Sequence, residues 1–235
     1  MQDSRLWLAA SILAAGLVAG SAIVAHSVIE FRSMERVVQV KGLSEREVAA
    51  DTVIWPIKFN EVDENLTTLV ANVERKNEQI KAFLTLQGFS QKEISTAVPQ
   101  IVDRKAGYYD PNANQLRYTA TSIVTVYSTN VDLVHQAMAK LLELSKSGIA
   151  IAGQDYDSKP EFIFSGLNDL KPDMIEEATR NAREVATKFA ADSSSQLGKI
   201  KAASQGQFSI SDRDSNTPYI KKVRVVATVD YYLSD

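Results

Sequence analysis

The apolar residues of the chain form one long uninterrupted run, and the residues after it show alternating and helical patterns. The run from Leu6 to Ala25 holds twenty residues without a charge. At roughly 1.5 Å per residue, a helix of that length matches the roughly 30 Å hydrocarbon core of a bilayer. A soluble helix of this length would show a polar stripe. The pattern therefore predicts a transmembrane segment within residues 1–32 and a separate body over residues 33–235.

Two interpretations of the N-terminal segment stay open, an uncleaved signal anchor and a cleaved secretory signal. A cleaved signal has a basic start, an apolar stretch of roughly 7–15 residues and a small-x-small cleavage site. Here Arg5 is offset by Asp3, and the apolar run is longer than such a stretch. Neither Ala22-Ile23-Val24 nor Val24-Ala25-His26 is a clean Ala-x-Ala pattern. We therefore favour the signal anchor.

Basic residues near the two ends of the run leave its orientation open. Arg5 precedes the run, whereas Arg32, Arg36 and Lys41 follow it. Read literally, the positive-inside rule would place the body in the cytoplasm, although long domains cross a membrane regardless of their charges.

The body begins with two strand patterns. Residues 36–41 alternate and end at Gly42, which predicts a strand followed by a turn. Residues 46–61 alternate again, and Pro56 inside this run must lie at an edge or a bulge because proline cannot donate to a strand ladder. Four apolar residues of the second run lie two apart on one face: Val53, Trp55, Ile57 and Phe59.

Two helices are predicted in the first two thirds of the body. Residues 63–86 form the first, which Gly88 ends, and Asn77 on its apolar face needs a partner. Residues 131–146 form the second, with Asn130 as its N-cap and Gly148 as its end. The inward residues are Leu66, Leu69, Val70, Val73, Ile80, Phe83 and Leu84 in the first helix, and Val134, Met138, Leu141 and Leu142 in the second.

A third helix is predicted from Asn168 or Asp169 to about Leu197, where Gly198 ends it. Pro172 is tolerated because it lies in the first turn. Its inward stripe is Ile175, Ala178, Ala182, Val185, Ala186 and Phe189.

Short strands complete the pattern and define the fold class. Their residues are 94–102, 116–128, 149–153, 161–166, 199–210 and 221–233. The connections between consecutive strands are mostly of hairpin length. This order predicts an α+β fold, with an antiparallel or mixed sheet and helices packed on its face.

Composition narrows the function classes. The chain has 26 Lys+Arg, 29 Asp+Glu and a net charge of −3, which argues against a nucleic-acid-binding surface. The one basic cluster, Lys221-Lys222-x-Arg224, is better interpreted as a solvated strand edge. The absence of cysteine excludes disulfides, thiol catalysis and thiolate metal sites. The two histidines, His26 and His135, are too few for a histidine-rich metal site, and His135 is expected on a helix as a surface or boundary residue.

No residue pattern indicates catalysis, so we predict no catalytic, cofactor-binding or metal-binding residue. Ser165-Gly166 lacks the flanking glycines of a nucleophile elbow. Asp155 and Asp157 have the spacing of a calcium loop but lack its later glycine and glutamate. Turn positions are the simplest interpretation of Asp110, Asp212 and Asp214. Tyr108-Tyr109 is expected in a loop, either as a contact point or as ordinary hairpin packing.

The chain resembles the SIMPL domain family, the YggE-like envelope proteins, over roughly residues 36 to 233. Ala50 stands where that family commonly has proline. The residues that carry the likeness are Val-x-Val-x-Gly at 38–42, Ala50-Asp51, Leu-x-x-x-Gly-Phe at 84–89, Glu93-Ile94-Ser95-Thr96, Tyr108-Tyr109, the strand 118–126, Val131-Asp132-Leu133, Glu176-Glu177-Ala178-x-x-x-Ala182 and Gly198-Lys199-Ile200.

This resemblance implies a periplasmic or membrane-tethered protein of α+β fold that tends to self-associate and has a loose link to envelope or oxidative stress. We expect the body in the periplasm and the N-terminal segment in the inner membrane. The resemblance implies no catalytic residues. We therefore expect a non-enzymatic protein that acts as a homo-oligomer or through protein partners, without nucleic acid. An envelope hydrolase or carbohydrate-active enzyme with an unrecognised site is the alternative, and a small-ligand or metal-binding module is a third class.

Overall fold

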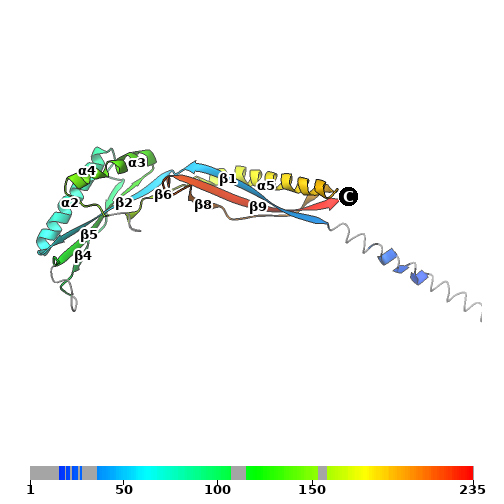
Figure 1. Cartoon of the computed structure of the whole chain (residues 1–235), viewed down its shortest axis with the longest axis horizontal. Helices are drawn as coiled ribbons and strands as arrows, with labels where there is room; N and C mark the ends of the chain where they lie inside the picture. Colours follow the sequence, from blue (N-terminus) through cyan, green and yellow to red (C-terminus); the bar gives the residue numbers. More distant parts are fainter. Residues whose placement is uncertain are drawn as a thin grey trace, which may run out of the picture. The chain divides into compact units, whose positions relative to one another are not determined.

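Figure 1 shows the computed structural model of the chain, which describes residues 16–18, 20–21, 23–25, 27, 36–106, 115–152 and 158–234. The elements from residue 37 onward are β1 (Val37–Ala49), β2 (Thr52–Asp63), α2 (Leu66–Leu86), β3 (Ile94–Thr96), β4 (Gln100–Asp103), β5 (Tyr118–Ser128), α3 (Val131–Ala139), α4 (Leu141–Lys146), β6 (Glu161–Ile163), α5 (Leu167–Asp192), β7 (Gln196–Gln205), β8 (Ser209–Asp212) and β9 (Ile220–Ser234). The predicted α+β class with antiparallel pairing is confirmed, and the strands divide between two sheets.

The chain packs as two compact units. Unit 1 takes its residues from Met1–Arg46, Leu170–Ser209 and Val223–Asp235, and unit 2 from Glu47–Asp169 and Ile210–Lys222. Most of the predicted membrane segment lies outside the described residues. Within the part of the chain that the structure describes, no helix combines the length and the apolar character needed to cross a bilayer.

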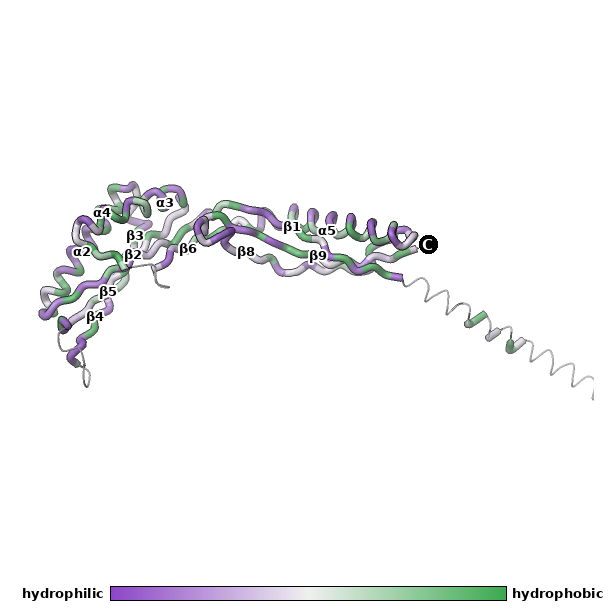
Figure 2. The backbone as a smooth tube through the Cα atoms, viewed as in Figure 1, coloured by the Kyte–Doolittle hydropathy of each residue, from purple (hydrophilic) through white to green (hydrophobic). Residues whose placement is uncertain are grey.

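Most residues of unit 1's sheet come from β1, β9 and β7, in the order β1-β9-β7, and β8, which lies mainly in the unit 2 segment, also pairs with β9. Helix α5 runs along this sheet (Figure 1), and its polar side is turned away from the strands (Figure 2). The period-2 pattern of β9 is confirmed, because Val223, Val225, Ala227 and Val229 are all buried. The sheet side of the helix is made of small residues, and its buried residues are Met174, Ala178, Ala182, Ala186 and Ala190.

The inward stripe predicted for α5 was therefore wrong in part. Ala178, Ala182 and Ala186 face inward as predicted, whereas Val185 and Phe189 are exposed. A helix that lies very close to a sheet needs small side chains at the contact, which excludes these two larger residues.

Gly42 shows how close this approach is. The predicted turn at Gly42 was wrong, because β1 continues through it to Ala49. A Cβ atom at Gly42 would lie 1.9 Å from the carbonyl oxygen of Ala178 and 2.4 Å from the amide nitrogen of Ala182. Glycine is therefore required here by the helix backbone that packs against it.

The C-terminal end of α5 was also predicted wrongly. The helix ends at Asp192, Ser194 has a positive φ of 54°, and Gly198 lies inside β7. A Cβ atom at Gly198 would lie 2.9 Å from the carbonyl oxygen of Tyr232. This glycine therefore permits close strand contact and does not end the helix.

Unit 2 is built on a five-stranded antiparallel sheet with the order β3-β5-β2-β6, in which β4 also pairs with β5. Helices α2, α3 and α4 lie over one of its faces (Figure 1). The predicted inward faces of β2 and β5 are confirmed, since Val53, Trp55, Ile57, Phe59, Ala120, Ser122, Val124 and Val126 are buried. Together with α2 and α3 these strands enclose the core of the unit.

Two hydrogen-bonding features of this unit, at Pro56 and Asn77, were predicted correctly. Pro56 lies beyond the end of β6, which pairs only with residues 52–54 of β2, so no neighbouring strand needs its missing donor. Asn77 is buried on α2 and finds its partner in Ser122, whose hydroxyl donates to Asn77 Oδ1 at 2.9 Å.

The helix predicted over residues 131–146 is broken at Lys140. Asn130 caps α3 as predicted by accepting from the Leu133 N–H, but α4 begins anew at Leu141. Leu144, seven residues after the buried Ala137, is buried, whereas Leu142, predicted to point inward, is 73% exposed.

Candidate functional site

The residues singled out from the sequence take mainly structural positions. Ser165 does not lie in a nucleophile elbow, because its N–H and its hydroxyl both donate to the Asp51 carboxylate. His135 is an exposed residue of α3, as expected. The predicted loop of Tyr108-Tyr109 and the aspartates Asp110, Asp155 and Asp157 lie outside the described residues.

The basic cluster near the start of β9 does not lie at a strand edge. β9 is a central strand between β1 and β7, so the edge interpretation was wrong. Lys221 is 7% exposed and pairs with Asp212, and Arg224 lies 3.8 Å from the carboxylate of Glu45. These cations are therefore neutralised by carboxylates of the same chain. Among the described residues no group of His, Asp and Glu side chains converges as a metal site would require.

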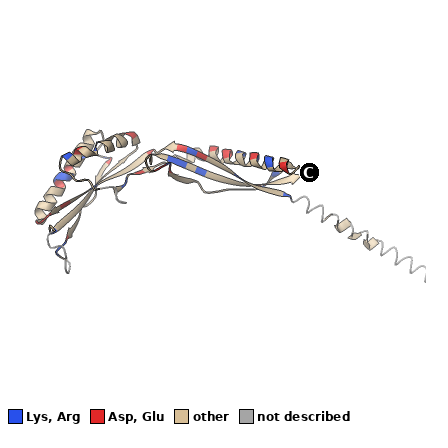
Figure 3. Cartoon of the chain, in the orientation of Figure 1, with Lys and Arg blue, Asp and Glu red and all other residues tan. Residues whose placement is uncertain are grey.

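Among the described residues, the face of the unit 2 sheet opposite the helices carries few charges, namely Lys58 of β2 and Glu161 of β6. We call it the open face. Strand β5 has no charged residue at all (Figure 3). Its residues are paired directly across strands, and they include Ile54, Pro56, Lys58, Asn60 and Val62 of β2, Val102 of β4, Glu161 of β6, and Thr119, Thr121, Ile123, Thr125 and Tyr127 of β5.

Several open-face side chains are accessible to a partner. Tyr127 is 56% exposed, Val102 48% and Val62 45%. Thr119 pairs with both Val62 and Val102, and its buried hydroxyl oxygen has no hydrogen-bond partner among the described residues. A sheet face on which threonine and apolar side chains outnumber the charged residues Lys58 and Glu161 is typical of surfaces that pack against protein.

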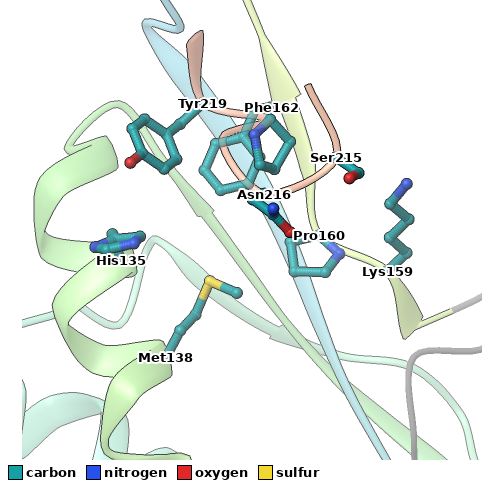
Figure 4. A pocket seen from close by; sticks show the side chains of 9 residues that line it. His135, Met138, Lys159, Pro160, Phe162, Ser215, Asn216 and Tyr219 are labelled. Carbon is teal, nitrogen blue, oxygen red and sulfur yellow. The ribbon is translucent and has the colours of Figure 1, made fainter. Parts of the chain in front are cut away.

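A pocket of about 320 Å³ lies on another side of unit 2 (Figure 4). The ring of Tyr219 lines it, with the His135 ring 5.1 Å away and the Phe162 ring 6.1 Å away, both in edge-on contacts. We call it the Tyr219 pocket. Its lining residues are His135 and Met138 of α3, Lys159, Pro160 and Phe162 around β6, and Ser215, Asn216, Pro218 and Tyr219 of the loop before β9.

The loop that carries Tyr219 is held in place at both ends. The carboxylate of Asp214 accepts from the N–H groups of Asn216 and Thr217, each at 2.9 Å. Hydrogen bonds from the Thr217 hydroxyl and the Arg213 guanidinium hold the pKa of Asp214 far below its usual range. Asp214 is thus a turn residue, as predicted.

Backbone contacts anchor Tyr219 itself. Its carbonyl oxygen accepts from the Ala50 N–H at 2.8 Å, a bond that a proline at position 50 could not donate. Ile220 donates to the carbonyl oxygen of Thr217 at 3.0 Å. The pocket wall is therefore preformed by the chain.

The pocket holds no arrangement for nucleophilic catalysis. A nucleophile needs a base within hydrogen-bond reach, and that base is in turn oriented by a third group. Among the described residues neither Ser215 nor His135 forms a hydrogen bond to a carboxylate, and no Asp or Glu lines the Tyr219 pocket. The site offers aromatic and apolar walls with one cation, which suits binding.

Sequence reasoning did not find this pocket. Its walls come from segments that are far apart in the chain, and nothing in α3 or β6 alone indicates that they meet. The available signal was the polar loop Ser211 to Pro218, which ends at an aromatic residue next to a strand.

The architecture therefore defines an α+β protein with two half-covered antiparallel sheets. A family model matches residues 38–231 of the chain, and it is described as SIMPL, a protein of unknown function (DUF541). The chain thus belongs to the SIMPL family, as the sequence pattern indicated. No curated protein matches the chain.

Proposed function

We propose that this SIMPL protein is a non-enzymatic envelope component that acts through self-association and through protein partners in envelope or oxidative stress. The observation that carries the proposal is the open face of unit 2. Within the described part of unit 2, the helices lie over the other face of the sheet, and the open face presents threonine and apolar side chains around Tyr127 and Val102. Two copies that stack these faces would bury Tyr127, a residue type enriched at interfaces.

The position of the predicted membrane segment adds to the argument. Copies tethered in one bilayer meet at a raised effective concentration, so a weak interface suffices for assembly. The second proposed function, an envelope hydrolase, needs convergent acid and base groups. No observation on the described residues favours it over assembly.

The absence of cysteine makes the interface directly testable. We would introduce Thr125→Cys on the open face and Gln136→Cys on α3 as the matched control, and oxidise the full chain in its native membrane. A symmetric interface through the open face yields a disulfide-linked dimer with the first variant and monomer with the second. Equal cross-linking of both variants would indicate random collision and contradict the choice of surface.

A second measurement tests whether the open face provides the stabilising contacts. The full chain in mild detergent should scatter light as a dimer or larger. The double variant Val102→Lys with Tyr127→Lys adds charges to exposed positions and should return the protein to a monomer. Leu142→Lys adds a charge to a side chain that is 73% exposed on the helical side, so it should leave the mass unchanged. A monomer of the unchanged chain at tens of micromolar would refute self-association.

We further propose that the body lies in the periplasm and that residues 1–32 remain attached as a single membrane anchor. The support is the uncharged run from Leu6 to Ala25. Intact-mass measurement of the mature protein should give the chain with that run present. In whole cells, the Gln136→Cys variant should react with a thiol reagent that cannot cross the inner membrane. Labelling that requires lysis would place the body in the cytoplasm.

A further inference from the structure

We propose that the Tyr219 pocket binds a small aromatic carboxylate, with the ligand ring against Tyr219 and Phe162 and its carboxylate at Lys159. This binding activity is separate from the proposed self-association, because no open-face residue lines the pocket. Figure 4 shows that the rings of Tyr219 and Phe162 and the Met138 side chain lie around the same space, with Lys159 at its margin.

The size and walls of the pocket select a single-ring ligand. Sites for small molecules are concave, mostly apolar and roughly 300–1,000 Å³ in volume, and this pocket, at about 320 Å³, falls at the lower end. The apolar part of the wall consists of Met138, Pro160, Phe162 and Pro218. An added aromatic ring would extend the edge-on series that already joins His135, Tyr219 and Phe162, an arrangement that aromatic rings favour.

The charges around the pocket favour an anion over a cation. Among the residues that the structure describes, Lys159 lines the pocket and no carboxylate does, and Asn216 and Ser215 add neutral hydrogen-bonding groups. A neighbouring hollow shares Lys159, Pro160, Phe162 and Pro218 with the pocket and adds Glu161, Asp212 and Lys221. There Asp212 is paired with Lys221, which leaves Glu161 as the acidic group that disfavours an anion at that end. The ligand carboxylate is thus directed to Lys159 from the Tyr219 side.

The wall is preformed, which lowers the ordering cost of binding. Asp214 fixes the backbone of Asn216 and Thr217, and Arg213 joins Asp214 at 3.0 Å and Glu47 at 3.5 Å. The Ala50 N–H holds the Tyr219 carbonyl. The loop therefore holds Asn216 and Tyr219 before any ligand arrives.

The test is ligand-observed NMR of the full chain with phenylacetate, 2-phenylethanol and benzylamine, three probes that share a ring and differ in charge. We expect phenylacetate to bind with a dissociation constant of about 1 mM or below, 2-phenylethanol to bind more weakly and benzylamine most weakly. No binding of phenylacetate, or benzylamine binding as tightly, would overturn the proposal.

Variants separate the roles of charge and ring. Lys159→Met should weaken phenylacetate by about threefold or more while leaving 2-phenylethanol unchanged, because a partly solvated ion pair has a modest strength. Lys146 is an exposed lysine of α4 outside the pocket, so Lys146→Met should leave the affinity for both probes unchanged. Tyr219→Leu should weaken the binding of both probes by about tenfold. Equal phenylacetate affinity in Lys159→Met and the unchanged chain would refute the proposed carboxylate position. The oligomeric mass of Lys159→Met should equal that of the unchanged chain, so failure here leaves the proposed assembly intact.

Discussion

The carboxylate of Asp51 holds the chain at Ser165. Asp51 Oδ2 accepts from the Ser165 N–H at 2.7 Å, from the Ser165 hydroxyl at 3.0 Å and from the Gly166 N–H at 3.2 Å. Its other oxygen accepts from the Thr52 hydroxyl at 2.9 Å. The short break between β1 and β2 is thus tied to the turn that follows β6, which explains an aspartate at a position where the strand pattern is interrupted.

This contact predicts an acid-sensitive contribution to stability. Burial alone raises the pKa of Asp51, but the hydrogen bonds from Ser165, Thr52 and Gly166 outweigh it and lower the pKa below its ordinary 3.8. A lowered folded-state pKa stabilises the fold at pH values above 3.8, and this stabilisation is lost as the pH falls through the folded-state value. Asp51→Asn should lower the free energy of unfolding by about 1–2 kcal/mol at pH 7. Urea unfolding at pH 7 and pH 3 measures this.

The control for Asp51 is the second hydrogen-bonded carboxylate of unit 2, Glu93. The hydroxyl of Ser128 and the N–H and hydroxyl of Ser90 lower the pKa of Glu93 in the same way. Below neutral pH the free energy of unfolding should fall as the pH falls. Asp51→Asn should make this fall smaller, and the contribution of Glu93 should remain. An unchanged slope would show that Asp51 has the same pKa in the folded and unfolded chain.

Gly42 should tolerate no side chain. Gly42→Ala places a methyl group against the backbone of α5 at Ala178 and Ala182, and backbone atoms cannot rotate away as side chains do. We expect a loss of about 3 kcal/mol or more in unfolding free energy, measured by urea denaturation. Leu43→Ala alters a neighbouring, 41% exposed residue of the same strand and should cost far less. Similar losses for both would contradict the close approach of helix and sheet.

The faces of the long strands were predictable because an alternating pattern has one interpretation once a core exists. Val53 to Phe59 and Tyr118 to Val126 illustrate this, since each predicted inward residue lies on the covered side. The helix α5 was harder to orient. Alanine is only weakly hydrophobic, so a hydrophobic pattern identifies its buried side poorly. The larger Val185 and Phe189 were therefore included in the predicted stripe, although they do not lie on the side that meets Gly42.

The candidate sites were not predictable from the pattern. The open face consists of residues that lie between the core residues of β2 and β5, so sequence identifies them as outward but gives no reason why helices leave them uncovered. The Tyr219 pocket depends on how α3, β6 and the loop before β9 meet in space. Local sequence carries no record of that tertiary arrangement.

The buried pair Asn77 and Ser122 should show strong energetic coupling. Asn77→Ala leaves the Ser122 hydroxyl buried without its acceptor, and Ser122→Ala leaves the Asn77 Oδ1 without its hydrogen-bond donor. Each single change should cost about 1–3 kcal/mol. The double variant should cost less than the sum of the two, because neither group is then left unpaired. Additive losses in a urea-denaturation cycle would show that solvent already satisfies both side chains.

Their different burial predicts opposite effects on stability for two leucines of α4. Leu144 is 4% exposed and packs in the core of unit 2, whereas Leu142 is 73% exposed. Leu144→Ala should lower the free energy of unfolding by about 2–5 kcal/mol, because it leaves a cavity in a packed interior. Leu142→Ala should change it by about 0.5 kcal/mol or less. The inward stripe predicted from the sequence instead includes Leu142, four residues after Met138. Urea denaturation of the two variants therefore tests which leucine faces the core, and a larger loss for Leu142→Ala would contradict the burial of Leu144.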